Sequence, residues 1–196
     1  MALLVVCTAA LVVSGLDPYD RLTWALEVAP IAIFFPILGL TASRFRFTPM
    51  AYRLIFIHAL ILILGAHYTY ERVPLGRWIQ DALDLGRNHY DRLGHFAQGF
   101  VPAIIAREVL ARRTPLRPGG WLFFLVTAVC LSISACFELV EWTAATILGA
   151  DADAYLATQG DPWDTQWDLF LALTGAVVAQ ALLGKAHDRQ LAGIPA

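Results

Sequence analysis

Four short stretches of the chain each carry two ionisable residues at a spacing of three or four. These pairs are His67 with Glu71, Asp91 with His95, Glu138 with Glu141, and Asp164 with Asp168. Residues three or four apart lie on the same face of an α-helix, so each pair presents its two groups in one direction. Imidazole and carboxylate groups together can bind a divalent metal or transfer protons, and the sequence leaves both kinds of chemistry open.

Glu138 is the most informative of these residues because it lies inside a long apolar segment. An acid at membrane depth is costly, usually faces the interior of a helix bundle, and is a functional-site hypothesis by default. The candidate catalytic residues are His95, Glu138, Glu141, Asp164 and Asp168. The candidate metal ligands are His95, Glu138, Glu141, Asp168, Asp91 and His67. Nitrogen and oxygen ligands without a thiolate suit zinc, manganese, iron or magnesium.

A structural interpretation competes with this one. Asp91 and Asp164 are placed where an acid stabilises the N-terminus of a helix. Arg72, Arg87 and Arg92 are close enough in sequence to neutralise the acids in ion pairs. No HExxH or CxxC motif narrows the choice.

The elements that carry these residues have the composition of a membrane protein. The 196 residues are 58% hydrophobic and 15% charged, and the mean hydropathy is +0.60. A soluble domain averages roughly 25% charged residues. A span needs about 20 apolar residues, and six segments are candidates: 2–16, 24–42, 51–70, 91–111, 121–148 and 167–185. We therefore predict an all-α, polytopic membrane protein, with one domain over residues 1–196 that is a bundle of six transmembrane helices.

The first of these segments is short, and it resembles the apolar part of a signal peptide. No Lys or Arg precedes residues 2–16, and no clear small-residue cleavage site follows them. We therefore expect a retained first span.

Arginines in the loops predict the orientation. The segments 43–53 and 107–120 and the C-terminal tail share one side of a six-span protein and carry most of the basic residues. The positive-inside rule places that side, with both termini, in the cytoplasm. The four ionisable pairs then lie together at the outer face. The expected location is a bacterial inner membrane.

Several other features carry weaker predictions. The segment 158–164 contains Gly160 and Pro162, which favour a tight turn that folds back over the bundle mouth or forms an ordinary loop. Residues 72–90 are expected to include a short amphipathic helix on the outer surface. Gly94, Gly99 and Ala103 indicate close helix packing. The remaining expectations are that Cys7, Cys130 and Cys136 are core residues, that His58 is a satisfied core histidine, and that His187 lies in a solvated tail.

Long motifs resemble the YjdF-like family of bacterial inner-membrane proteins. They are His67–Tyr70, residues 87–100 with Arg107-Glu108, the stretch from Phe137 to Trp142, and residues 158–168. The resemblance covers roughly residues 50–180 of the sequence. The biochemical function of this family is unknown, so the resemblance implies the membrane class and a site at these motifs, and it implies no reaction.

A weaker similarity connects the chain to VanZ-like membrane proteins. Asp91, His95-Phe96, Glu138, Asp168 and Gly175 match their pattern loosely. The Asn that those proteins usually carry near the final Asp is missing here, so nothing is carried over from them.

Three functions remain open. The first is a metal-dependent or acid–base enzyme, a hydrolase or transferase, that acts on a lipid or envelope precursor. The second is a small ion-coupled transporter, which needs a cavity that crosses the midplane. The third is a non-catalytic membrane partner whose cluster consists of structural ion pairs. The expected partners are membrane lipid and a second copy or another membrane protein, and the net charge of −2 gives no sign of nucleic-acid binding.

Overall fold

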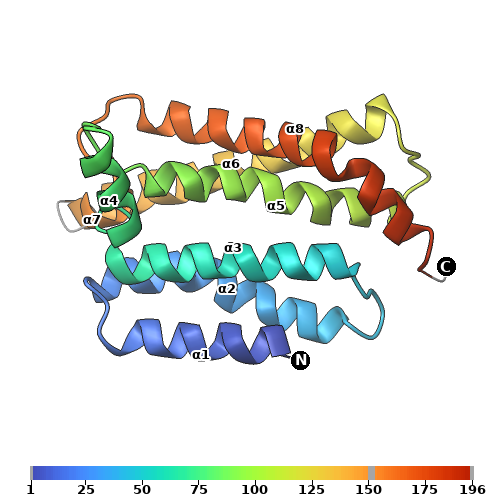
Figure 1. The fold of residues 1–196 in the computed structure, drawn as a ribbon, viewed down its shortest axis with the longest axis horizontal. Coiled ribbons are helices and arrows are strands. Elements are labelled where there is room, and N and C mark those ends of the chain that lie inside the picture. Colours follow the sequence, from blue (N-terminus) through green and yellow to red (C-terminus); the bar gives the residue numbers. More distant parts are fainter. Residues whose placement is uncertain (1, 150–152, 195–196) are drawn as a thin grey trace.

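The computed structural model describes residues 2–149 and 153–194 and is helical throughout, without strands in those residues. The helices are α1 (Ala2–Leu16), α2 (Arg21–Thr41), α3 (Pro49–Tyr68), α4 (Pro74–Ala82), α5 (Tyr90–Arg113), α6 (Gly120–Leu148), α7 (Asp153–Leu156) and α8 (Asp164–Leu191). The long helices run side by side in an elongated bundle (Figure 1). The predicted all-α class is confirmed.

Four of the long helices are long and apolar enough to cross a membrane, namely α2, α3, α6 and α8. Helix α1 is apolar but has only 15 residues. Helix α5 has 24 residues, but it carries many charged side chains, several of which are buried inside the protein. The multi-pass architecture is therefore supported, while the count of six spans stays a prediction.

Local sequence signals fix the helix ends. The side chain of Asp20 accepts a hydrogen bond from the backbone N–H of Thr23 at the start of α2, and Thr48 caps α3 in the same way through Ala51. Helix α3 ends in two residues with left-handed backbone conformation, Thr69 and Tyr70. That turn directs the chain away from the bundle toward α4.

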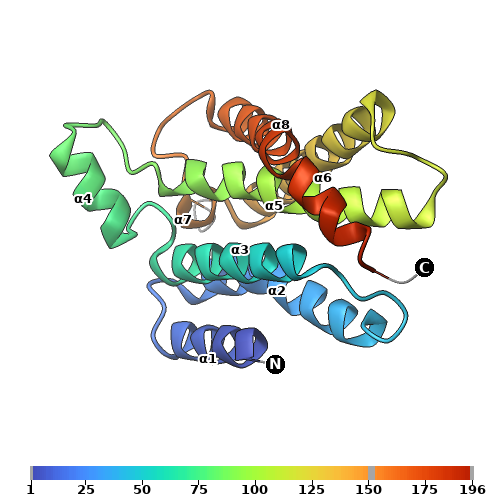
Figure 2. The same ribbon diagram turned by 45° about the vertical axis from the view of Figure 1, so that its right-hand side comes forward.

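The bundle has two distinct ends. Helices α4 and α7 lie at one end, where α5 and α8 begin, and we call it the α4 end (Figure 1). Both chain termini lie toward the opposite end, which we call the terminal end. The predicted short helix within residues 72–90 is present as α4, which stands out from the bundle in Figure 2 and leaves Trp78 exposed.

Glycines allow α5 and α8 to approach closely. A Cβ on Gly99 of α5 would collide with the carbonyl oxygen of Ala172 on α8. A Cβ on Gly175 of α8 would collide in turn with the carbonyl oxygen of Phe96. The expected close packing on α5 is therefore present at Gly99, and it brings the N-terminal halves of the two helices together.

Two sequence predictions about single residues are wrong. Cys7 and Cys130 are buried as expected, but Cys136 is exposed on the apolar outer surface of α6. His187 is fully buried, because α8 continues as helix to Leu191 instead of ending near residue 185.

Candidate functional site

A buried cluster of one histidine and three carboxylates lies at the α4 end. His95 Nε2 is 3.6 Å from Asp91 Oδ1 and 3.9 Å from Asp168 Oδ2. His95 Nδ1 is 3.8 Å from Glu138 Oε1. All four residues are at most 8% exposed. Three helices supply them, since Asp91 and His95 lie one turn apart on α5, Glu138 on α6 and Asp168 on α8.

Several polar atoms of this cluster have no hydrogen-bond partner. Among the described residues, His95 Nδ1, Glu138 Oε1 and Asp168 Oδ1 are buried and unpaired. Buried polar atoms in proteins are nearly always bonded, and an exception calls for an explanation such as an ion or a ligand. The cluster therefore has the character of a binding site.

The geometry suits a divalent cation on the Nε2 side of His95. Asp91, His95 and Asp168 each offer one ligand atom, and these atoms all lie within 4.8 Å of one another. Ligands at the usual metal distances of about 2.0–2.2 Å can be at most about 4.4 Å apart, so small adjustments would close the site. Glu138 faces the other ring nitrogen of His95, Nδ1, which is where carboxylates that orient a metal-bound imidazole are found.

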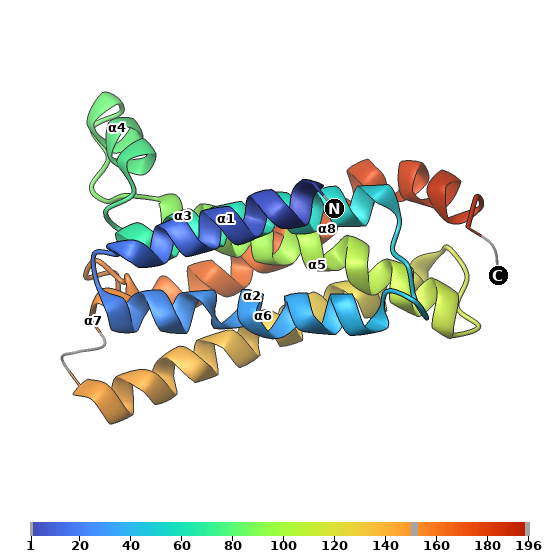
Figure 3. The same cartoon turned by 90° about the horizontal axis from the view of Figure 1, so that it is seen from below.

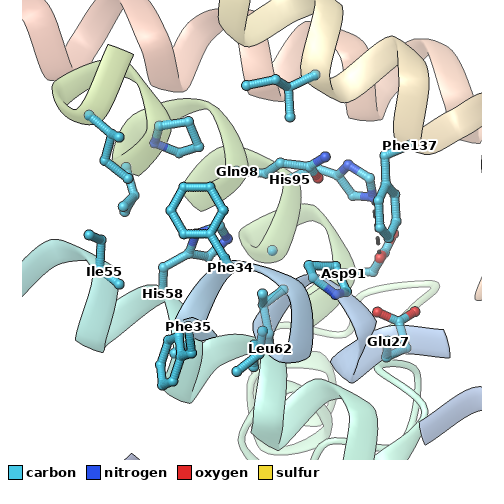
Figure 4. Close-up of a pocket in the computed structure, with 18 of the residues that line it drawn as sticks. Glu27, Phe34, Phe35, Ile55, His58, Leu62, Asp91, His95, Gln98 and Phe137 are labelled. Atoms are coloured by element: carbon cyan, nitrogen blue, oxygen red, sulfur yellow. Dashed lines mark ion pairs between the residues drawn. The ribbon is translucent and has the colours of Figure 1, made fainter. Parts of the chain in front are cut away.

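A cavity of about 250 Å³ extends from this cluster between α2, α3, α5 and α6. Figure 4 shows Glu27, Asp91 and His95 toward one side of this cavity, with Phe34, His58 and Ile55 farther along it. Glu141 also contributes to the cavity wall. The site is therefore continuous with an interior space large enough for part of a ligand.

Sequence reasoning missed two polar residues of this cavity. Glu27 on α2 is only 4% exposed, and the phenol of Tyr70 faces it. The signal that could have found Glu27 was present, since it is an acid inside an apolar segment.

The other predicted site residues lie apart from the unpaired atoms. The guanidinium of Arg87 donates a 2.6 Å hydrogen bond to Asp164, so this acid is neutralised as the structural interpretation expected. His67 Nδ1 lies 2.9 Å from the backbone carbonyl oxygen of Ser14 on α1. Glu71 forms an ion pair with Arg72. The pair of His67, at the end of α3, and Glu71, in the turn that follows, is therefore not brought to the cluster.

The segment between α7 and α8 folds onto the start of α5. The side chain of Gln159 accepts a hydrogen bond from the backbone N–H of Asn88 and donates one to the backbone carbonyl of the same residue. Arg92 donates a 2.8 Å hydrogen bond to Asp161. These bonds hold residues 157–164, which we call the mouth segment, next to the cluster.

A second buried cluster lies near the terminal end of α5. Both oxygens of Glu108 accept hydrogen bonds from the backbone N–H of Thr48, and further bonds come from the Thr48 hydroxyl and Arg112. His187 Nε2 lies 3.1 Å from Glu108. Glu108 and His187 are fully buried.

The expectation that His58 is a satisfied core histidine is also wrong. In the described part of the chain its Nε2 is buried without a hydrogen-bond partner. The residue lines the cavity beside apolar side chains, which cannot accept or donate a hydrogen bond.

The fold and the apolar helices define the class as a multi-pass integral membrane protein, here with a buried histidine–carboxylate cluster. The chain belongs to the family described as "Predicted membrane protein (DUF2238)", whose profile matches residues 1–189. It is 50% identical over 184 residues to the "Inner membrane protein YjdF" of Escherichia coli (strain K12), which covers 94% of this chain and 88% of that protein. No solved structure matches the chain. The resemblance to the YjdF-like bacterial family is confirmed, and with it a multi-pass inner-membrane location.

Proposed function

We propose that this protein is a membrane-embedded enzyme, a hydrolase or transferase that acts on the headgroup of a lipid or envelope precursor. The observation that carries the proposal is the convergence of three buried residues, Asp91, His95 and Asp168, whose potential ligand atoms all lie within 4.8 Å of one another. Oxygen and nitrogen ligands of this kind suit a divalent cation. Three protein ligands leave coordination positions open, as catalytic metal sites do.

Each residue of the cluster has a separate role in this proposal. Asp91, His95 Nε2 and Asp168 hold the cation, which when bound supplies a Lewis acid for a phosphoryl or acyl oxygen. Glu138 lies near Nδ1 of His95 and fixes the orientation of the imidazole. Glu141, on the cavity wall, is the candidate general acid or base.

Asp164 takes a different role from the one predicted for it. We propose that it holds the mouth segment, and the support for this role is its hydrogen bond with Arg87.

The proposed topology has six spans, with α1 and α5 crossing the membrane beside the four apolar helices. The arginine-rich connections 43–53 and 107–120 lie at the terminal end and face the cytoplasm by the positive-inside rule. The α4 end then faces outward, and the cluster meets headgroups of the outer leaflet.

One observation supports a second candidate function, an ion-coupled transporter. The cavity follows α5 from Asp91 to Ala106, well past the middle of that helix. His58 and Gln98 are its polar residues between the cluster and the far end, and the rest of that stretch is apolar. A flux measurement in liposomes distinguishes this function, because an enzyme changes the lipid without moving ions.

The third function, a non-catalytic partner with structural ion pairs, predicts that arginines fill the cluster. Arg87 and Arg92 instead bond to Asp161 and Asp164 in the mouth segment. The arginines therefore form structural ion pairs with the mouth segment. The cluster of Asp91, His95, Glu138 and Asp168 is left available to bind a ligand.

The proposal is tested by metal analysis of protein purified in detergent without chelator. We expect a near-stoichiometric divalent metal in the wild type that is lost in Asp168→Asn and His95→Ala and reduced in Glu138→Gln. Asp84→Asn is the matched control, because Asp84 is exposed beyond α4. A folded wild-type protein that neither co-purifies with nor takes up zinc, manganese, iron or magnesium would overturn the metal-dependent function.

A further inference from the structure

The apolar length of the cavity is the feature that the proposed function leaves unused. We propose that it binds one hydrocarbon chain of a membrane lipid, and that this chain enters sideways between α2 and α6 while the headgroup lies at the His95 cluster. The inference rests on the proposed function for the identity of the headgroup site. It adds the substrate class, a lipid that is bound by its chain as well as by its headgroup.

The shape of the cavity suits a chain. The residues of α5 that line it recur every three or four positions, from Asp91 through Gln98 to Ala106, so they form a single stripe along one face of the helix. At 1.5 Å of rise per residue this stripe is about 22 Å long. The cavity itself has a volume of about 250 Å³, slightly below the roughly 300–1,000 Å³ of ordinary ligand pockets. A space that is long and small in volume admits a chain better than a compact molecule.

The chemistry of the wall changes along the cavity. Glu27 and Asp91 lie near the starts of α2 and α5 and Glu141 lies near the end of α6, and all three line the cavity together with His95. Farther along, the wall consists largely of aliphatic and aromatic side chains: Phe34, Phe35, Ile55, Ala59, Val101 and Ile105. Figure 4 shows this change from charged to apolar side chains across the site. The pattern matches an amphiphile whose polar group lies at the cluster.

The cavity also has an opening toward the surrounding lipid. Phe34 on α2 and Ile133 on α6 line it, yet they are 41% and 43% exposed. A side chain that contacts both the interior space and the outer surface marks a place where the two connect. Figure 3 shows α6 diverging from the bundle, and from α2, toward its C-terminal end. Because the outer surface there is apolar, a chain can enter from the bilayer without crossing water.

Photo-crosslinking tests the inference. The protein is reconstituted in liposomes that contain phosphatidylethanolamine with a diazirine near the end of one acyl chain, and the labelled residues are mapped by mass spectrometry. We expect label on inward-facing residues of α3 and α5 near Ile55 and Ile105, in addition to label on outward residues such as Leu182. Ala106→Phe, which fills the far end of the cavity, should lose most of the inward label.

The matched control is Ala181→Phe, the same substitution on an exposed position of α8, and it should retain the inward label. Ile133→Trp narrows the opening and decides the test if Ala106→Phe does not fold. Inward label that is absent from the wild type, or unchanged in folded Ala106→Phe or Ile133→Trp, would overturn the inference.

Asp168→Asn separates this inference from the proposed function. It should abolish metal binding and leave the inward label in place, because the chain contacts lie away from the cluster. Inward label in a wild-type protein that binds no metal would support chain binding while the metal-dependent function fails.

Discussion

A buried cluster that contains acids lies near each end of helix α5, and the two clusters differ in how completely their carboxylate oxygens are bonded. Near the terminal end, Glu108 accepts hydrogen bonds from Thr48 and Arg112 and lies against His187. Near the α4 end, Glu138 and Asp168 approach His95 only to 3.8–3.9 Å and each has an oxygen without a partner in the described residues. The protein itself supplies hydrogen-bond partners for Glu108, whereas Glu138 and Asp168 each have an oxygen that a bound ligand could still pair with.

The comparison teaches how a buried acid can be interpreted in a membrane bundle. Burial alone does not distinguish a structural acid from a ligand site, since Glu108 is more deeply buried than Glu138. The two kinds of acid differ instead in whether both carboxylate oxygens have hydrogen-bond partners. A saturated acid stabilises the packing of its neighbours, and an unsaturated acid costs stability that only a bound ligand recovers.

The largest expected effect is on the saturated acid. Glu108→Ala removes the acceptor for several buried donors, and it should destabilise the protein by about 3–5 kcal/mol, the usual cost of breaking a buried charge network. Asp168→Asn in chelator-treated protein should leave stability unchanged or raise it slightly, because it removes a buried charge that has an unbonded oxygen. Thermal unfolding in detergent measures both. Equal losses in the two variants would remove the distinction between the clusters.

An intermediate effect is expected at Gly99, which lies between the two clusters. Gly99→Ala places a Cβ against the backbone of Ala172, and overpacking of this kind costs about 1–3 kcal/mol. The shift of α8 should also separate Asp168 from His95 and weaken metal uptake. Gly39→Ala is the control, since a Cβ there meets open space, and it should stabilise α2 by about 0.5–1 kcal/mol. A neutral Gly99→Ala would show that close packing does not position the site.

The smallest effect is expected in the mouth segment. Gln159→Ala removes two hydrogen bonds to the backbone of Asn88, each worth about 0.5–1.5 kcal/mol. Hydrogen exchange of residues 157–164 should become faster, while metal content stays at the wild-type level. Gln166→Ala, at an exposed position of α8, should change neither quantity. Loss of metal in Gln159→Ala would make the mouth segment part of the binding site.

The helical elements could be predicted from the sequence because membrane helices are recognised by length and apolar character alone. Among the long helices in the described part of the chain, α5 alone is too polar for the apolar criterion, because it carries charged residues such as Asp91, Arg107 and Glu108, which neighbouring helices enclose. The pairing of His95 with Asp91 followed from helical spacing. The approach of Asp168 could not be predicted in this way, because it depends on how α8 packs around α5.

Two buried polar residues, His187 and Glu27, have partners that come from distant parts of the chain. His187 was expected in solvent because it follows Lys185, yet it bonds to Glu108, which is far away in the sequence. The partner of Glu27, Tyr70, likewise comes from the turn after another helix, although the acid itself is marked by its place inside an apolar segment. Long-range partners of single polar residues leave no periodic signal, so spacing rules cannot reveal them.

The exposure of Cys136 has a practical consequence for spectroscopy. The chain contains three cysteines, and Cys7 and Cys130 are buried, so a spin label or fluorophore added to the native protein should attach selectively at Cys136. That position is one residue before Phe137, which lines the cavity, and on the same helix as Ile133. Its mobility and its accessibility to lipid-soluble quenchers would report how α6 moves relative to α2 without any engineered mutation.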